Sequence, residues 1–224
     1  MKEEKVLLVF PHPDDEAFGA AGTISQFTNR GVSVTYACLT LGQMGRNMGN
    51  PFFATRESLP DIRKKELRDA CKEMGIQDVR MLGFHDKTVE FEDPEITIKK
   101  ITDIINEIKP TLVITFYPEH GVHPDHDATS RATIEAIRRL DSNNRPTVWC
   151  IAITNNRFDV IGKPDIQNDV RDVANQKLRA IKSHRSQTEA MFKDISSIED
   201  FEHITDERIK RFFGKETFYT YKFE

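Results

Sequence analysis

Apolar residues in this chain fall into short continuous runs that alternate with stretches of helical periodicity. The continuous runs predict strands at 5–10, 32–40, 79–82, 111–117, 147–154 and 218–223. The periodic stretches predict helices at 17–29, 61–74, 95–109, 125–140 and 177–184. Short apolar strands separated by helices are typical of a mostly parallel sheet that helices cover on both faces. The pattern therefore predicts an α/β fold.

One long segment, 41–60, shows neither pattern. It is rich in Gly, Asn and Met and exceeds the length of an ordinary connection, so we expect it to form the rim of a functional site. The chain of 224 residues has no internal repeat and no low-complexity stretch. That length suits one domain with a substantial core, and we predict a single domain over 1–224.

A cluster of ionisable residues directly follows the first apolar run. Residues 11–16 read Pro-His-Pro-Asp-Asp-Glu, so one imidazole and three carboxylates stand within five positions. The two prolines restrict the directions in which His12 and its acidic neighbours leave the strand. Adjacent carboxylates repel one another unless a cation or hydrogen bonds compensate them. We interpret the cluster as part of a divalent metal site in preference to a solvated acidic loop.

A second cluster follows the apolar run at 112–117. Residues 120–126 read His-Gly-Val-His-Pro-Asp-His and hold three of the seven histidines of the chain. A helix that begins near Pro124 places His126 in its first turn and His123 just before it, so that both can face one point. Histidines gathered in this way favour a metal site. Because parallel strands end at one edge of a sheet, where α/β proteins bind ligands, we expect the two clusters to converge there.

Taken together, the two clusters resemble the motifs of the LmbE-like (PIG-L) deacetylase family, His-Pro-Asp-Asp-Glu and a later His-Pro-Asp-His. Both motifs occur here without a substitution. The resemblance implies a Rossmann-like fold and a zinc-dependent enzyme that removes N-acetyl groups from small molecules containing glucosamine. It implies that His12, Asp15 and His126 are the metal ligands. It also implies that Asp14 is the general base and that His123 faces the developing oxyanion.

The residue types explain how such a site works. Two imidazoles and one carboxylate hold Zn²⁺ with a position open for water, which is the pattern of a catalytic site, and Fe²⁺ suits the same ligands. Zinc lowers the pKa of that water to about 7, and Asp14 accepts its proton as hydroxide attacks the amide carbonyl. Zinc and a protonated His123 then stabilise the oxyanion. Either Asp14 or His123 protonates the departing amine, and the sequence leaves that choice open.

Three further residues flank the motifs. Glu16 either orients a backbone amide or His12 as a structural carboxylate, or acts directly in catalysis. We expect Asp125 to hydrogen-bond an imidazole and so to fix its tautomer. His120 is an alternative ligand to His126, and it ranks lower because it lies outside the family motif.

Substrate-binding residues follow from the resemblance and from location. The segment that begins at Arg63 resembles the family's Arg-x-x-Glu-Leu helix, whose arginine reaches the sugar, although a solvated helix face explains Arg63 about as well. Asp86 resembles the acidic residue that binds sugar hydroxyls in relatives. Arg46 and Arg56 flank the long loop and offer guanidinium groups suited to a carboxylate.

The aglycone follows from a resemblance within the family. The chain length and the Ser-His-Arg-Ser-Gln segment at 183–187 resemble the deacetylases of bacillithiol biosynthesis, which act on N-acetylglucosaminyl L-malate. We therefore predict hydrolysis of the N-acetyl amide of that small amino-sugar conjugate and, as in many family members, a homo-oligomer. We expect His184 and Gln187 to have packing roles.

Three other functions are compatible with the predicted metal ligands. A bacillithiol S-conjugate amidase hydrolyses an amide on the same amino sugar, so the motifs do not separate it from a deacetylase. A non-haem Fe(II) oxygenase also uses two histidines and a carboxylate, but such enzymes commonly have a β-rich fold and have no need of Asp14. A sugar-binding protein without turnover would need neither Asp14 nor His123.

Composition narrows the function further. The net charge of −4, the pI near 6.0 and the scattered basic residues argue against nucleic-acid binding. Cys38, Cys71 and Cys150 are far apart in the sequence, which fits a reducing compartment. A few mainly charged residues precede the first strand, and no apolar run approaches the ~20 residues that span a membrane. We expect a cytoplasmic protein without a signal peptide or a membrane span.

Overall fold

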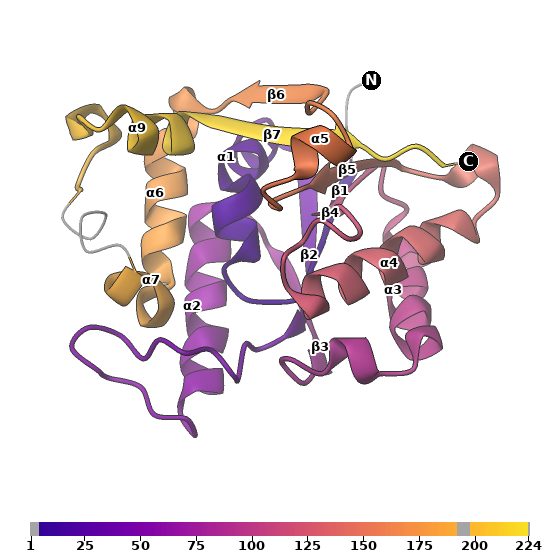
Figure 1. Cartoon of the computed structure of the whole chain (residues 1–224), viewed down its shortest axis with the longest axis horizontal. Helices are drawn as coiled ribbons and strands as arrows, with labels where there is room; N and C mark the ends of the chain where they lie inside the picture. The colour runs from indigo at the N-terminus through magenta and orange to yellow at the C-terminus, as the bar shows by residue number, and fades with distance from the viewer. Residues whose placement is uncertain (1–4, 192–197, 224) are drawn as a thin grey trace.

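A seven-stranded sheet forms the centre of the protein (Figure 1). The computed structural model describes residues 5–191 and 198–223. The strands are β1 (Lys5–Phe10), β2 (Ser33–Thr40), β3 (Asp78–Phe84), β4 (Leu112–Phe116), β5 (Thr147–Ile151), β6 (Ile166–Asp169) and β7 (Lys215–Thr220). In the order β3-β2-β1-β4-β5-β7-β6, the first five are parallel, and β7 runs antiparallel to β5 and β6. The predicted α/β fold with a mostly parallel sheet is confirmed.

Helices cover both faces of this sheet (Figure 1). They are α1 (Asp15–Asn29), α2 (Leu59–Glu73), α3 (Pro94–Ile108), α4 (Pro124–Arg138), α5 (Arg157–Val160), α6 (Ala174–Ser183), α7 (Arg185–Met191) and α9 (Glu207–Gly214), with short 3₁₀ helices at Val89–Phe91, Ser142–Asn144, Arg171–Val173 and Phe201–His203. Helices α1, α2 and α6 pack on one face, against Val6, Leu8 and Phe10 of β1. Helices α3 and α4 pack on the other, against Leu7 and Val9. Because successive side chains of a strand point to opposite faces, the apolar run of β1 supplies both cores.

Predicted and observed elements differ mainly at their ends. Helix α1 begins at Asp15, because acidic side chains are favourable in a first helical turn, where the chain was expected to remain a loop. The last strand, β7, begins at Lys215, directly after α9. The prediction lacks β6, α5, α7 and α9, which have at most eight residues each and are too short to establish a period. Residues 1–4, on which the absence of a signal peptide was predicted, lie outside the described residues.

The topology sets where a ligand can bind. Strand β1 lies between β2 and β4, so the strand order reverses beside it, and α/β proteins bind ligands in the crevice at such a reversal. The two ionisable clusters follow the carboxyl ends of β1 and β4, which are neighbours in the sheet. They therefore meet in this crevice, as predicted. Segment 41–58, which follows β2, contains no helix or strand.

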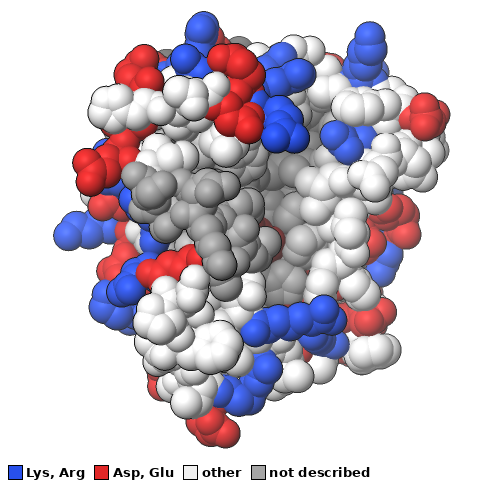
Figure 2. Space-filling model, turned by 60° about the vertical axis from the view of Figure 1, so that its left-hand side comes forward, with Lys and Arg blue, Asp and Glu red and all other residues white. Residues whose placement is uncertain are grey.

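The surface of the protein carries charges of both signs. On the face shown in Figure 2, Lys and Arg side chains are interspersed with Asp and Glu side chains around a central hollow. Within the described residues, no helix is both long and apolar enough to cross a membrane. All three cysteines are buried and free, and free buried cysteines behave as small apolar residues.

Candidate active site

Asp14 stands at a sharp bend between β1 and α1. Its backbone has φ 118° and ψ −25°, a conformation that is costly for a residue with a Cβ atom and that clusters at functional sites. Glu16 Oε2 accepts the Asp14 N–H at 3.0 Å. Arg63 donates to Pro13 O and, at 2.9 Å, to Asp14 Oδ2. The bend turns the two aspartates apart and leaves the side chain of Asp14 20% exposed, against 9% for Asp15.

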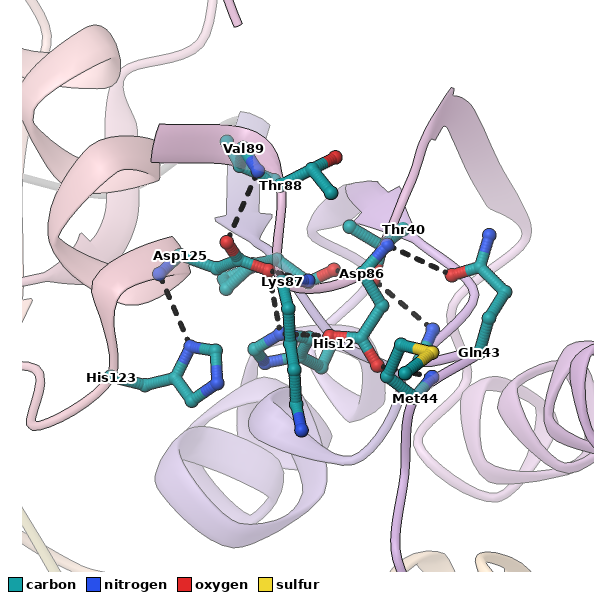
Figure 3. Close-up of polar contacts among 12 residues, drawn as sticks. His12, Thr40, Gln43, Met44, Asp86, Lys87, Thr88, Val89, His123 and Asp125 are labelled. Carbon is teal, nitrogen blue, oxygen red and sulfur yellow. Dashed lines mark hydrogen bonds and ion pairs between the residues drawn. The ribbon is translucent and has the colours of Figure 1, made fainter. Parts of the chain in front are cut away.

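The His12 imidazole turns one nitrogen toward two carboxylates. His12 Nε2 lies 3.3 Å from Asp125 Oδ2 and 3.2 Å from Asp86 Oδ1 (Figure 3). Ionised carboxylates only accept hydrogen bonds, so this nitrogen carries a hydrogen. In the neutral ring, the other nitrogen, Nδ1, then presents a lone pair on the opposite side.

The His126 imidazole is oriented by the loop that precedes it. His126 Nδ1 donates to Gly121 O at 2.7 Å, and the ring stacks on Phe116 with the centroids 4.0 Å apart. Because a carbonyl only accepts, Nδ1 carries the hydrogen and Nε2 presents the lone pair. The site thus contains two imidazoles that each have one nitrogen ready to bind a cation.

These two nitrogens and one carboxylate converge on a single point. His12 Nδ1 and His126 Nε2 are 3.1 Å apart, and Asp15 oxygens lie 3.5 Å from the first and 3.3 Å from the second. Tetrahedral ligands at about 2.0–2.2 Å from an ion stand roughly 3.3–3.6 Å from one another. The three residues predicted as ligands therefore have the chemistry and the spacing of a divalent metal site with a fourth position left for water.

The pKa values of the same residues reflect their crowding. Burial would lower the pKa of His12, but its hydrogen bonds, that to Asp125 foremost, outweigh burial and raise this pKa well above its ordinary value. Burial would raise the pKa of Asp15, but charge on His126 and the hydrogen bond from His12 lower it far below its ordinary value. When no ion is bound, a proton on His12 compensates the neighbouring carboxylates. A divalent ion would displace protons from the imidazole lone pairs on binding.

Asp14 differs from Asp15 in its electrostatics. Burial raises the pKa of Asp14 to about 6, and the neighbouring charge of Asp15 adds to this effect while Arg63 opposes it. A carboxyl group whose pKa lies close to neutral pH is suited to both accepting and returning a proton.

The surroundings of His123 favour its neutral ring over the protonated ring that the sequence led us to expect. Its Nδ1 accepts the N–H of Asp125 at 3.1 Å, which caps α4. Burial, followed by the charges of His12 and His126, lowers the pKa of His123. Ring nitrogens of the three histidines lie within 4.8 Å of one another. His123 therefore offers an Nε2–H donor beside the metal site without carrying a charge.

Residues 7–137, which include both motifs, match the profile of the family described as PIG-L: GlcNAc-PI de-N-acetylase. The chain belongs to the PIG-L family. Relatives from Bacillus cereus and Bacillus subtilis are 55% and 48% identical over 99% and 98% of this chain and 100% and 98% of their own, and both are named "Probable N-acetyl-alpha-D-glucosaminyl L-malate deacetylase 2". The solved N,N'-diacetylchitobiose deacetylase from Pyrococcus horikoshii shares the fold, with a TM-score of 0.75 at 24% identity over 98% of this chain and 84% of that one.

In this PIG-L protein, Asp125 joins three segments. It is fully buried and accepts the backbone N–H groups of Lys87 and Val89 at 2.7 and 3.1 Å (Figure 3). Its third contact is with His12. The predicted contact with an imidazole is present, and the partner is His12 rather than the neighbouring His126.

Asp86 also lies in the site, where the resemblance places a sugar-binding residue. One of its oxygens faces His12, and the other accepts the Met44 N–H at 2.8 Å (Figure 3). Gln43 Oε1 in turn accepts the Asp86 N–H at 3.1 Å. The prediction omitted Gln43, although a polar residue just beyond a strand at the ligand-binding edge was its signal. Asp86 thus connects the loop after β2 to the His12 ring.

The three arginines predicted to contact substrate differ in their surroundings. Arg63 is 3% exposed and bonds Asp14 and two backbone carbonyls, so the solvated helix face is excluded. Arg56 is exposed and donates to a carbonyl of its own loop at 2.8 Å. Arg46 is exposed and has no hydrogen bond or ion pair with any residue that the structure describes.

The two remaining predicted residues occupy different positions relative to the site. His120, the alternative ligand, turns its Nδ1 to Thr154 Oγ1 at 2.6 Å. Glu16 is fully buried, accepts the Asp14 N–H and contacts His184 Nε2 at 2.7 Å. Of the two options for Glu16, the structure shows the carboxylate that orients a backbone amide.

Lys87 is a cation at the site that the prediction omitted. Its backbone is in the left-handed region, with φ 65°. Figure 3 shows the side chain extending between His123 and Met44, past His12. The side chain is exposed and has no hydrogen bond or ion pair within the described part of the chain. A lysine after an acidic residue is too common a pair to have indicated this position from sequence.

Proposed function

We propose that this protein is a metal-dependent N-deacetylase that hydrolyses the N-acetyl group of N-acetylglucosaminyl L-malate in bacillithiol biosynthesis. The observation that carries the proposal is the convergence of two imidazole lone pairs and the Asp15 carboxylate beside the strained Asp14. The identity of the conjugate is supported by the two Bacillus relatives, which are named for it and align over nearly the whole chain.

His12, Asp15 and His126 would hold the metal. Two neutral nitrogens and one carboxylate at these spacings suit Zn²⁺, and Fe²⁺ binds the same donor types. A bound ion of this kind supplies a water with a pKa lowered to about 7 and a positive charge for the amide oxygen. The remaining steps of the reaction belong to side chains of the protein.

Asp14 takes the proton of the attacking water. Arg63 holds Asp14 Oδ2 at 2.9 Å, so Oδ1 is the oxygen left to face the water. The pKa of about 6 makes Asp14 a stronger base than an ordinary aspartate and still leaves it mostly ionised at neutral pH. The burial that raises this pKa therefore also serves the reaction.

His123 stabilises the oxyanion, and Asp14 protonates the amine. The Nε2–H of neutral His123 donates to the amide oxygen as negative charge develops on it. Since the Asp125 N–H engages Nδ1, the hydrogen of His123 stays on Nε2. Asp14, which received the proton of the water, delivers it to the nitrogen as the C–N bond breaks. The products are acetate and the free amino sugar.

Two exposed cations provide charge for the carboxylates of malate. Lys87 extends past His12 at the opening of the site (Figure 3), and Arg46 lies two residues beyond Met44, whose N–H is bound by Asp86. Both have their charged groups unpaired within the described residues. A dicarboxylate aglycone supplies a partner for each.

Amine release from three substrates tests the proposal. We expect zinc- or iron-loaded protein to act on the malate conjugate in preference to N-acetylglucosamine and to a bacillithiol S-conjugate, and stripped protein to be inactive. Asp14→Asn keeps the shape of the side chain and removes the base, so we expect a loss of about 10²–10⁴-fold in kcat. Preference for the S-conjugate would replace the substrate assignment, and full activity of Asp14→Asn would refute the mechanism.

A further inference from the structure

His184 is fully buried beneath the bend that carries Asp14. Its Nε2 lies 2.7 Å from Glu16 Oε1, and neither side chain is exposed. The other oxygen of Glu16 accepts the Asp14 N–H at 3.0 Å. His184 Nδ1 is buried and has no hydrogen-bond partner among the described residues. The contact with Glu16 is therefore the polar interaction that orients this ring, and it joins positions 168 residues apart.

A second contact ties the same segment to α2. Ser186 donates its N–H and its hydroxyl to Glu66 at 2.7 Å each. Glu66 lies three residues after Arg63 on α2, and Arg63 holds the Asp14 carboxylate from the other side. Together with the chain between His184 and Ser186 and the helical turn between Arg63 and Glu66, these contacts form a closed network through Asp14, Glu16, His184, Ser186, Glu66 and Arg63.

This network of six residues contributes little net free energy to the stability of the fold. Its members other than Asp14 are between 0% and 6% exposed, and buried ionisable groups cost much of what their contacts return. A satisfied polar network instead specifies one geometry of the groups it joins. Here the network holds Asp14 from two sides, and Asp14 is its member with the most exposed side chain. A hydrogen-bond network with this arrangement is expected to position the Asp14 carboxylate.

We propose that His184 and Glu16 are positioning residues for the base: the buried pair holds the Asp14 backbone in its positive-φ bend and thereby aims the carboxylate. The proposal rests on the proposed function in so far as Asp14 is the base. Loss of the His184 contact lets the Glu16 carboxylate turn and release the Asp14 N–H. Asp14 then relaxes from φ 118°, and a displacement of about 1 Å at a reacting group costs about 100-fold in rate.

Variants at position 184 test this inference. His184→Gln retains a side-chain N–H within reach of Glu16, whereas His184→Leu removes it. His184→Asn, whose shorter amide does not reach Glu16, replaces the leucine variant if that one fails to fold. Lys177→Met is the matched control: Lys177 on α6 is as deeply buried as His184, but its 3.0 Å ion pair is with Glu216, which accepts the N–H groups of Gly22 and Thr23 further along α1 and not that of Asp14. Kinetics, zinc content and Tm are measured for each.

We expect His184→Leu to lose about 100-fold in kcat with little change in KM and with full zinc content. His184→Gln recovers most of the lost kcat. Lys177→Met lowers Tm and keeps kcat. A kcat that falls equally in the leucine variant and in the control, at equal loss of Tm, would show a merely structural role and overturn the proposal.

A second readout does not depend on turnover. In NMR spectra, the Asp14 amide is expected to shift and to exchange its hydrogen faster in His184→Leu, and to return in His184→Gln. An Asp14 amide that stays unchanged in His184→Leu overturns the positioning role whatever the activity. If the amide responds as expected while the wild-type protein hydrolyses no amide, the positioning of Asp14 stands and the proposed function fails.

Discussion

Each histidine of the site has one ring nitrogen engaged by the protein, and that engagement decides what the other nitrogen does. Carboxylates take the Nε2–H of His12, and a carbonyl takes the Nδ1–H of His126, so both rings present a lone pair to an ion. In His123 a backbone N–H occupies Nδ1, which leaves Nε2–H as a donor. One residue type thus supplies two ligands and one hydrogen-bond donor.

Asp125→Asn tests whether this engagement tunes the metal site. The asparagine side chain keeps one acceptor oxygen, but its NH₂ group would face N–H donors that the Asp125 carboxylate binds in the wild-type protein. The contact that orients His12 is therefore lost. We expect metal affinity, measured by competition with a chromogenic chelator, to fall about 10–100-fold. Glu135→Gln is the control: Glu135 lies on α4, is partly exposed and pairs with Arg138, so its loss leaves the affinity unchanged. Equal affinities in the two variants would contradict the role given to Asp125.

Lys87→Ala tests the assignment of the malate carboxylates. Removal of one charged hydrogen bond raises KM for the malate conjugate by roughly 10-fold or more with kcat unchanged, because the contact is the same in ground and transition states. KM for N-acetylglucosamine, which has no carboxylate, stays the same. Lys99→Ala on α3 serves as the control, since Lys99 pairs with Asp103 on the surface. An equal rise in KM for both sugars would remove Lys87 from aglycone binding.

At the scale of elements, the start of α4 carries much of the site. His123 caps the helix, and Asp125 and His126 lie in its first turn. The first N–H groups of a helix have no partner within it, and one of them, from Asp125, therefore occupies His123 Nδ1. The loop before the helix supplies Gly121, whose carbonyl orients His126. The geometry of the site therefore depends on the close approach of this loop to the helix.

Gly121→Ala tests that close approach. A Cβ atom at position 121 would stand 2.5 Å from His126 Cβ, and neither atom can move without its backbone. We expect His126 to be displaced and metal binding to weaken by at least about 10-fold. Gly83→Ala is the control: it has open space but a φ of 80°, so it lowers stability through backbone strain and leaves metal affinity intact. Wild-type affinity in Gly121→Ala would contradict the packing described here.

Over the whole molecule, features that depend on local sequence patterns could be predicted, and features that depend on contacts between distant residues could not. Strand β1 was predicted at its observed bounds, and β4 within one residue at each end, because continuous apolar runs are local. The meeting of the two motifs followed from the rule for parallel sheets. The bend at Asp14 and the tautomer of His123 depend on hydrogen bonds that only the folded chain forms. The partner of Glu16 lies 168 residues away, so its role stayed open until the fold was known.

The buried pair of His184 and Glu16 gives the molecule a pH-dependent stability. Burial would lower the pKa of His184, but the charge and hydrogen bond of Glu16 outweigh it and raise this pKa above 6.5. Below about pH 6.5 the folded and unfolded states both hold the proton, and the contribution is fully present. As pH rises through the raised pKa, the folded state loses its extra proton, and the contribution is lost.

The free energy of unfolding measures this effect. We expect the difference between the wild-type protein and His184→Gln to shrink from about pH 6.5 upward, by at most about 1.4 kcal/mol per pH unit. Urea titrations of both proteins without metal, across this range, give the difference. A difference that stays constant or grows with pH would contradict the raised pKa.

The central claim is that the two motifs form one metal site that hydrolyses an N-acetyl amide. Its most direct test is to strip the protein of metal, add Zn²⁺ stepwise, and follow acetate release from the malate conjugate together with bound metal. The account predicts that activity rises in proportion to bound metal and reaches its plateau at one ion per chain, and that His126→Ala neither binds the ion tightly nor recovers activity. Full activity of the stripped protein, or of His126→Ala, would contradict it.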